Sequence, residues 1–266
     1  MTVAYLTQHP IDWLLERFEE EKNEGVLSIA ILPSERILQK IADTVGHEPV
    51  VSYYFSHDVF PFEEVRLSKG IRNSRIASLA GLHFDKSKWV MTTLHGLLRK
   101  TIPPHVFEER VVCLEVNQET VLSSALLHRM GYERVFTVRD HGEYSIKGDI
   151  IDIFPPDSNH PYRIELFDAT VERIRSFDSS TQKSISGYQK IAITVAAECS
   201  NFEEDQELAR QRILRAERTL GVVDSEASDQ LDGLETVAGI YYEKQSCLID
   251  YTRGKTSFYL VNPDEA

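Results

Sequence analysis

Apolar residues in the first 117 positions alternate between short unbroken runs and helical spacing. The run over residues 26–32 has the length of a buried strand, and the apolar positions within 37–45 share one helical face. Pro33 and Ser34 separate the two patterns, because proline ends a strand and serine caps a helix. The same patterns predict strands at 49–55 and 88–91, and helices at 11–21, at 72–82 and from Leu94 to the Pro103-Pro104 pair. This alternation predicts an α/β fold with a parallel sheet.

The pattern changes after Val112. A helix is expected over residues 119–130, and Gly131 suits the position just after its end. Strand-like runs then follow one another with only short Gly, Pro, Asp, Asn and Ser connections, which is hairpin chemistry. These runs cover 134–138, 143–146, 149–154, 162–167, 171–177 and 188–195. We therefore expect an α+β unit with an antiparallel sheet over residues 118–196, between flanking pieces at 1–117 and 197–266.

The last piece opens with a long helix expected over residues 202–220. Asn201 and Glu204 are spaced as an N-cap and capping box, and Gly221 ends the pattern. Residues 222–233 are acidic and rich in Ser and Asp, so we expect a mobile stretch there. Three short strands are expected at 240–242, 246–249 and 257–261.

Charge narrows the possible functions. The chain has 29 Lys+Arg and 42 Asp+Glu, a formal net charge of −13, and residues 191–266 alone carry 7 basic and 15 acidic residues. Such a balance argues against a protein whose main activity is coating nucleic acid. No apolar stretch reaches the roughly 18 residues of a membrane span, and the start lacks a secretory pattern. Three cysteines, far apart and odd in number, are typical of free thiols in the cytoplasm.

Catalytic motifs give no positive case for an enzyme. Gly254-Lys255-Thr256 lacks the first glycine of a phosphate-binding loop, so we interpret it as a hairpin turn. Ser180 and Lys183 have the spacing of an acyl-enzyme nucleophile but none of its companion motifs. The nine histidines form no zinc spacing, and we expect neither a metal nor another cofactor.

The segment Tyr162-Arg-Ile-Glu-Leu-Phe167 carries more information. In a strand, Tyr162, Ile164 and Leu166 share one face and Arg163, Glu165 and Phe167 share the other. Arginine and aromatic residues on an outward face are typical anchors of protein interfaces. In the alternative interpretation a neighbouring loop covers Phe167, and Arg163 pairs locally with Glu165. Sequence alone leaves these two interpretations open.

Several segments together resemble a known family. They are Gly131-Tyr-Glu-Arg-Val135, Gly142-Glu-Tyr-Ser-Ile-Lys-Gly-Asp-Ile-Ile-Asp-Ile-Phe-Pro155, Pro161-Tyr-Arg-Ile-Glu-Leu-Phe167 and Ile174-Arg-Ser-Phe-Asp178, with weaker matches at Asp58-Val-Phe-Pro-Phe62, Val90-Met-Thr-Thr-Leu94 and 239–262. The chain resembles the N-terminal region of the bacterial transcription-repair coupling factors (Mfd), in the part that they share with the excision-repair subunit UvrB. The match is dense over residues 119–195.

The resemblance implies a degenerate helicase-like α/β domain in two parts, residues 1–117 and 197–266. It implies that the α+β domain at 118–196 is inserted between them and docks the UvrA subunit. Carried over, the docking residues are Lys147, Arg163 and Phe167, with Lys147 standing where the family usually has arginine. Glu165, which shares the outward strand face with Arg163 and Phe167, completes the expected partner-binding set. Because lysine lacks the planar fork of arginine, bidentate pairing with a carboxylate is lost at that position.

The resemblance also implies what the chain does by itself. It lacks the phosphate loop and the aromatic-rich hairpin of UvrB, so we expect a non-catalytic, monomeric recruitment module. The chain ends before the polymerase-binding and motor domains of the family, so RNA polymerase and DNA are reached only through such domains. It is expected to be either the N-terminal portion of a coupling factor or a stand-alone relative. An ATP-dependent repair enzyme and a direct DNA-binding module remain the alternatives.

Overall fold

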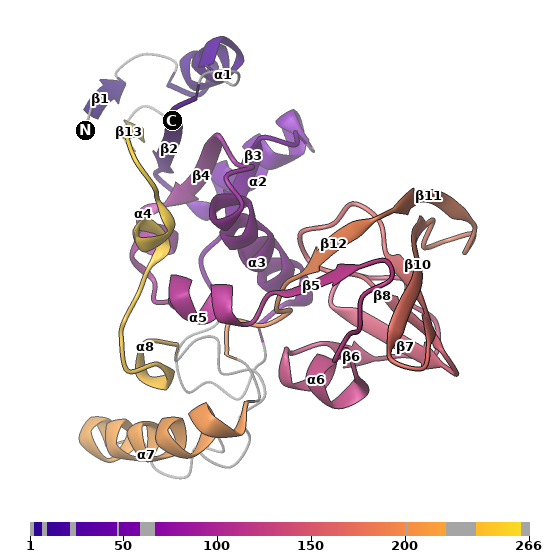
Figure 1. Ribbon diagram of the computed structural model, residues 1–266. Coiled ribbons are helices and arrows are strands. Elements are labelled where there is room, and N and C mark those ends of the chain that lie inside the picture. The colour runs from indigo at the N-terminus through magenta and orange to yellow at the C-terminus, as the bar shows by residue number, and fades with distance from the viewer. Residues whose placement is uncertain are drawn as a thin grey trace.

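The computed structural model describes residues 3–6, 10–21, 25–46, 48–58, 67–199, 202–221 and 238–261. Two sheets organise these residues, one parallel and one mainly antiparallel, so the fold is mixed α/β (Figure 1). Every helix in these ranges is too short or too polar to span a bilayer.

The first sheet has five parallel strands in the order β1-β13-β2-β4-β3. Its strands are β1 (Val3–Leu6), β2 (Leu27–Leu32), β3 (Val51–Tyr54), β4 (Trp89–Thr93) and β13 (Thr256–Val261). The C-terminal strand β13 therefore lies between β1 and β2, far from its neighbours in sequence (Figure 1). The expected parallel sheet is confirmed, and β1 is a strand that the sequence did not predict.

Helices cover both faces of this sheet. They are α1 (Pro10–Glu21), α2 (Glu35–Val45), α3 (Lys69–His83), α4 (Leu94–Leu98) and α5 (Pro104–Glu109). On β2, Ala30 and Leu32 pack with buried residues of α1 and α2, whereas Leu27 and Ile29 belong to the core that contains the buried face of α3. Two apolar faces on one strand explain why residues 26–32 are an unbroken apolar run.

The second sheet has six strands in the order β11-β10-β9-β8-β7-β6. They are β6 (Glu133–Arg134), β7 (Glu143–Lys147), β8 (Ile150–Ile153), β9 (Tyr162–Phe167), β10 (Thr170–Phe177) and β11 (Ser184–Tyr188). All neighbours are antiparallel except β6 and β7, which run parallel. Buried Ile151, Ile164 and Ile174 join Leu127 of α6 (Ser124–Arg129) in the main core. The opposite face of the sheet carries the candidate site.

A two-stranded ribbon connects the two sheets. Strand β5 (Val112–Glu115) leads into the second sheet, and β12 (Lys190–Ile193) returns from it and pairs antiparallel with β5 (Figure 1). The expected strand at 188–195 is therefore wrong in extent, because Tyr188 ends β11 and β12 is a separate strand. The split follows from pairing, since β11 extends the six-stranded sheet and β12 does not.

A buried ion pair fixes the returning chain to the first sheet. Arg75 of α3 and Glu198 are both fully buried, and the Arg75 Nε donates to one carboxylate oxygen while Nη2 lies 3.1 Å from the other. Arg75 also donates to the Phe55 carbonyl at 2.7 Å and to the Tyr54 hydroxyl at 2.5 Å. The His57 Nε2 lies 3.5 Å from the same carboxylate. Because the ions are bonded on several sides, their charges remain compensated away from water.

The C-terminal part corrects two expected strands. Helices α7 (Glu203–Leu220), α8 (Ala238–Tyr241) and the 3₁₀ helix η3 (Leu248–Tyr251) precede β13. The strands predicted at 240–242 and 246–249 are therefore wrong, whereas the one at 257–261 is confirmed. A side-chain cap explains η3, since the Asp250 carboxylate accepts from the Cys247 backbone N–H at 2.8 Å and starts a helical turn.

Two helix boundaries also differ from expectation. The helix expected over 119–130 begins only at Ser124, after Ser123, whose hydroxyl accepts from the Leu126 N–H at 3.2 Å. The helix expected from Leu94 to the Pro103-Pro104 pair already ends at Leu98, and the proline pair instead starts α5, because proline suits the first turn of a helix. The expected cap at Asn201 and Glu204 and the acidic stretch 222–233 lie outside the residues that can be described.

Candidate protein-docking surface

The exposed side of the six-stranded sheet brings the predicted site residues onto one face. Cross-strand pairing places Ile150 opposite Glu165, Asp152 opposite Arg163, and Lys147 opposite Ile150. Partners directly opposite each other share a face of the sheet. We call this side the open face and define it by Lys147, Ile150, Asp152, Arg163, Glu165, Phe167, Arg173 and Arg175.

Phe167 lies at the end of β9, and 67% of its surface is exposed. Three positions earlier, on the opposite side of the strand, Ile164 is fully buried, so the strand separates a core face from a solvent face. The interpretation in which a neighbouring loop covers Phe167 is therefore wrong. An exposed benzyl ring at a strand end can enter an apolar pocket of another protein.

Arg163 is fixed in position by its own sheet. Its Nε and Nη2 donate to the two carboxylate oxygens of Asp152 at 2.7 and 2.8 Å, and the guanidinium carbon lies 4.6 Å from the centre of the Phe177 ring. The hydrogen bonds to Asp152 raise the pKa of Arg163 above its ordinary value. A bidentate pair that leaves the Arg163 side chain 23% exposed presents a pre-oriented cation at the surface.

Glu165 does not pair with Arg163, so the local pair weighed from the sequence is wrong. The Glu165 carboxylate accepts from Arg175 Nη2 and lies 3.9 Å from Arg173 Nη1. The reason is register, since Glu165 stands opposite Arg173 on β10 while Arg163 stands opposite Asp152 on β8. Within the open face Glu165 therefore holds two arginines together.

Lys147 ends β7 at the hairpin to β8, before Gly148, whose φ is +60°. Its Nζ lies 4.1 Å from the centre of the Phe136 ring, a cation–π contact. Phe136 is 84% exposed and was not singled out from the sequence. The strand predicted over 134–138 is wrong in extent, because β6 ends at Arg134. The alternation of faces assumed for that strand therefore gave no indication that Phe136 is exposed.

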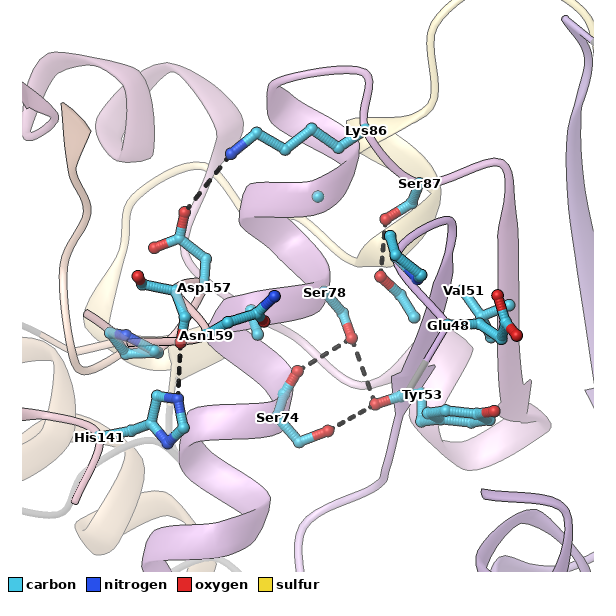
Figure 2. A pocket seen from close by; sticks show the side chains of 16 residues that line it. Glu48, Val51, Tyr53, Ser74, Ser78, Lys86, Ser87, His141, Asp157 and Asn159 are labelled. Atoms are coloured by element: carbon cyan, nitrogen blue, oxygen red, sulfur yellow. Dashed lines mark hydrogen bonds and ion pairs between the residues drawn. The ribbon is translucent and has the colours of Figure 1, made fainter. Parts of the chain in front are cut away.

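Away from the open face, residues that the structure describes also line two cavities. One, of about 530 Å³, separates α3 and β3 from residues 156–159 (Figure 2). Its polar groups are largely bonded to the protein itself, as where Ser74 Oγ donates to the Tyr53 carbonyl at 2.7 Å and His141 Nε2 lies 2.8 Å from the Ser158 carbonyl. We interpret it as a polar joint between the two sheets rather than as a ligand site.

The second cavity, of about 720 Å³, lies beside the N-terminus of α2. Glu35, the first residue of that helix, accepts from the Thr93 hydroxyl at 2.5 Å and from the Ser56 N–H at 3.3 Å. In parallel sheets a helix start that follows a strand is the usual phosphate site, and a carboxylate there repels an anion. Among the described residues no group of three or more His, Cys, Asp or Glu comes together as a metal site requires.

The part of the chain that contains the second sheet matches a known domain family. Residues 112–198 match the family described as the UvrB interaction domain. This range begins on β5 and ends at Glu198, so it contains the connecting ribbon and the open face.

Over a longer range the chain is similar to proteins named transcription-repair-coupling factor. It is 26% identical over 253 residues to the one from Staphylococcus haemolyticus, which covers 88% of this chain and 22% of that protein. It is 24% identical over 251 residues to that of Haemophilus influenzae (90% and 22%) and 28% over 247 residues to that of Bacillus subtilis (84% and 21%). The likeness expected from the sequence is thereby confirmed, and the chain spans about a fifth of the length of these relatives.

Proposed function

We propose that this chain is a non-catalytic recruitment module that binds the UvrA subunit through the open face. The observation that carries the proposal is that one strand of the matched domain presents both a fixed arginine, Arg163, and an exposed aromatic ring, Phe167, on the same face. Lys147 and Glu165 complete the proposed contact, as a cation at the hairpin and as the residue that orients two arginines.

The role in the cell follows from the relatives. Transcription-repair coupling is the function in their name, so we infer that the module links stalled transcription to nucleotide excision repair in the cytoplasm. Contacts with RNA polymerase and DNA are then left to other parts of a coupling factor. We further propose that the module acts as a monomer.

The remaining pieces are proposed to be a degenerate helicase-like domain in two parts, residues 1–117 and 197–266, around the UvrA-binding domain at 118–196. The position of β13 between β1 and β2 supports this division, because the last piece completes a sheet that the first piece begins. The Glu35 carboxylate at the start of α2 supports the absence of ATP hydrolysis.

Binding to purified UvrA, measured by titration calorimetry with the full chain, tests the proposal. Arg163→Ala and Phe167→Ala should each weaken binding at least tenfold, since anchors of this kind are worth about 2 kcal/mol or more. Leu208→Ala is the matched control, because Leu208 is 52% exposed on α7, away from the open face (Figure 1). If both site variants bind like the control, the site assignment is wrong.

A further inference from the structure

An aromatic residue outside the expected set lies at the border of the open face. Phe136 is the most exposed large apolar residue of the described chain, at 84%, and the Ser145 hydroxyl donates to its carbonyl at 3.2 Å. Ser145 pairs with Asp152, and Lys147 lies over the Phe136 ring. These contacts place the ring beside β7, on the same side of the sheet as Arg163.

The two exposed rings are far enough apart to act as separate anchors. The Phe136 ring contacts Lys147 of β7, and two strand spacings of about 4.8 Å, roughly 10 Å in all, separate β7 from β9, the strand of Phe167. Ile150, 39% exposed on β8, lies between them. An ordinary interface of about 800 Å² per partner is wide enough to cover all three residues.

Most of the charged residues that define the open face are basic. The open face carries four cations, Lys147, Arg163, Arg173 and Arg175, against two anions, Asp152 and Glu165. Both anions are already engaged, Asp152 by Arg163 and Glu165 by Arg175. In a chain of net charge −13 this face is a local cationic area. Charge complementarity therefore favours an acidic partner surface.

We infer that Phe136 is a second anchor of the open face, and that the face fits a UvrA surface with two apolar contact points surrounded by acidic residues. This inference rests on the proposed function, which supplies the partner. Lys147 holds the Phe136 ring toward solvent and at the same time supplies one of the cations that meet the acidic rim.

The experiment is a titration of the full chain with purified UvrA at 50 mM NaCl. Phe136→Ala should weaken binding at least fivefold, as expected of an interface aromatic, while the Leu208→Ala control binds like the unmodified chain. Melting temperatures should agree within about 2 °C, because both side chains are exposed. If Phe167→Ala weakens binding but Phe136→Ala does not, the inference is overturned and the proposed function stands. If the unmodified chain does not bind UvrA, both are overturned.

The salt dependence of binding distinguishes the contribution of acidic residues on the partner from that of the apolar contacts. Raising NaCl from 50 to 300 mM should weaken binding of the unmodified chain at least fivefold, because partly exposed charges are screened. The double variant Lys147→Met, Arg173→Met keeps the apolar stems and should show a distinctly shallower salt dependence. Affinity that does not change with salt would overturn the acidic partner surface.

Discussion

The fully buried pair of Arg75 and Glu198 gives the sharpest stability prediction. Glu198→Gln keeps the shape of the side chain but leaves the Arg75 charge uncompensated in a site without solvent exposure. Removing one partner of a buried pair typically costs about 3–5 kcal/mol. Arg75→Met should lower the free energy of unfolding by a similar amount. It leaves the Glu198 charge unpaired and removes the donor that lies 2.7 Å from the Phe55 carbonyl.

The double variant Arg75→Met, Glu198→Leu distinguishes ion pairing from simple packing. With neither charge left buried, it should cost less than either single change, about 1–2 kcal/mol. Urea unfolding at pH 7.5 measures these values. Tryptophan fluorescence reports on the first sheet, because the only two tryptophans, Trp13 of α1 and Trp89 of β4, pack in the core on one side of it. Glu133→Gln is the control.

That control breaks the exposed pair between Lys69 and Glu133, which also joins α3 to the second sheet. It should change the free energy of unfolding by less than about 1 kcal/mol. If Glu198→Gln costs no more than Glu133→Gln, or if the two single costs simply add in the double variant, the buried pair does not hold the returning chain as described.

Two further predictions concern pH and a glycine. Burial lowers the pKa of three histidines below 6.5, so the folded state binds fewer protons than the unfolded state, and the free energy of unfolding should fall as the pH drops from 7.5 toward 5. These histidines are His57, His83 and His141. Burial alone would raise the pKa of Glu198, but the charges and hydrogen bonds of Arg75 and His57 together outweigh it and lower that pKa, which adds a further loss of stability below about pH 4.5. Urea midpoints across the pH range test both effects, and a rise in stability toward pH 5 contradicts them. Gly131→Ala should cost about 2–4 kcal/mol, because φ is +88° and a Cβ would stand 2.5 Å from the Ala197 Cβ, whereas Gly148→Ala, with open space around it, should cost only about 1 kcal/mol in the same denaturation assay.

Hydrophobic periodicity correctly predicted the elements that show a regular apolar face and a clear local boundary. The strand over 162–167 and the helix capped by Ser34 are present as expected, because alternation and capping are local properties. The segments around Ile240 and Leu248 were wrong, since short apolar runs suit a strand or a helical turn equally well. Tertiary contacts decide such cases: the hydroxyl of Tyr251, for example, donates to the Ile102 carbonyl at 2.9 Å.

Contacts across strands could not be read from the sequence. Arg163 and Glu165 are neighbours on one face, but each pairs with another strand, Asp152 of β8 and Arg175 of β10. Those partners depend on register, which hairpin lengths and a bulge in β10 set together. Phe136 was missed for a related reason, because its position depends on where β6 ends.

The arrangement of charges predicts how affinity would be divided over the proposed contact on the open face. Because Arg163 is already bonded to Asp152, it loses little conformational freedom when a partner binds, but it also has fewer donors left to offer. Its contribution is therefore mainly orientation and charge. Phe167 and Phe136 are different, since most of their surface is in water before binding and can be removed from it afterwards. Hence the two rings should mainly set the dissociation rate of the complex. The cations should mainly set its association rate and the choice of partner.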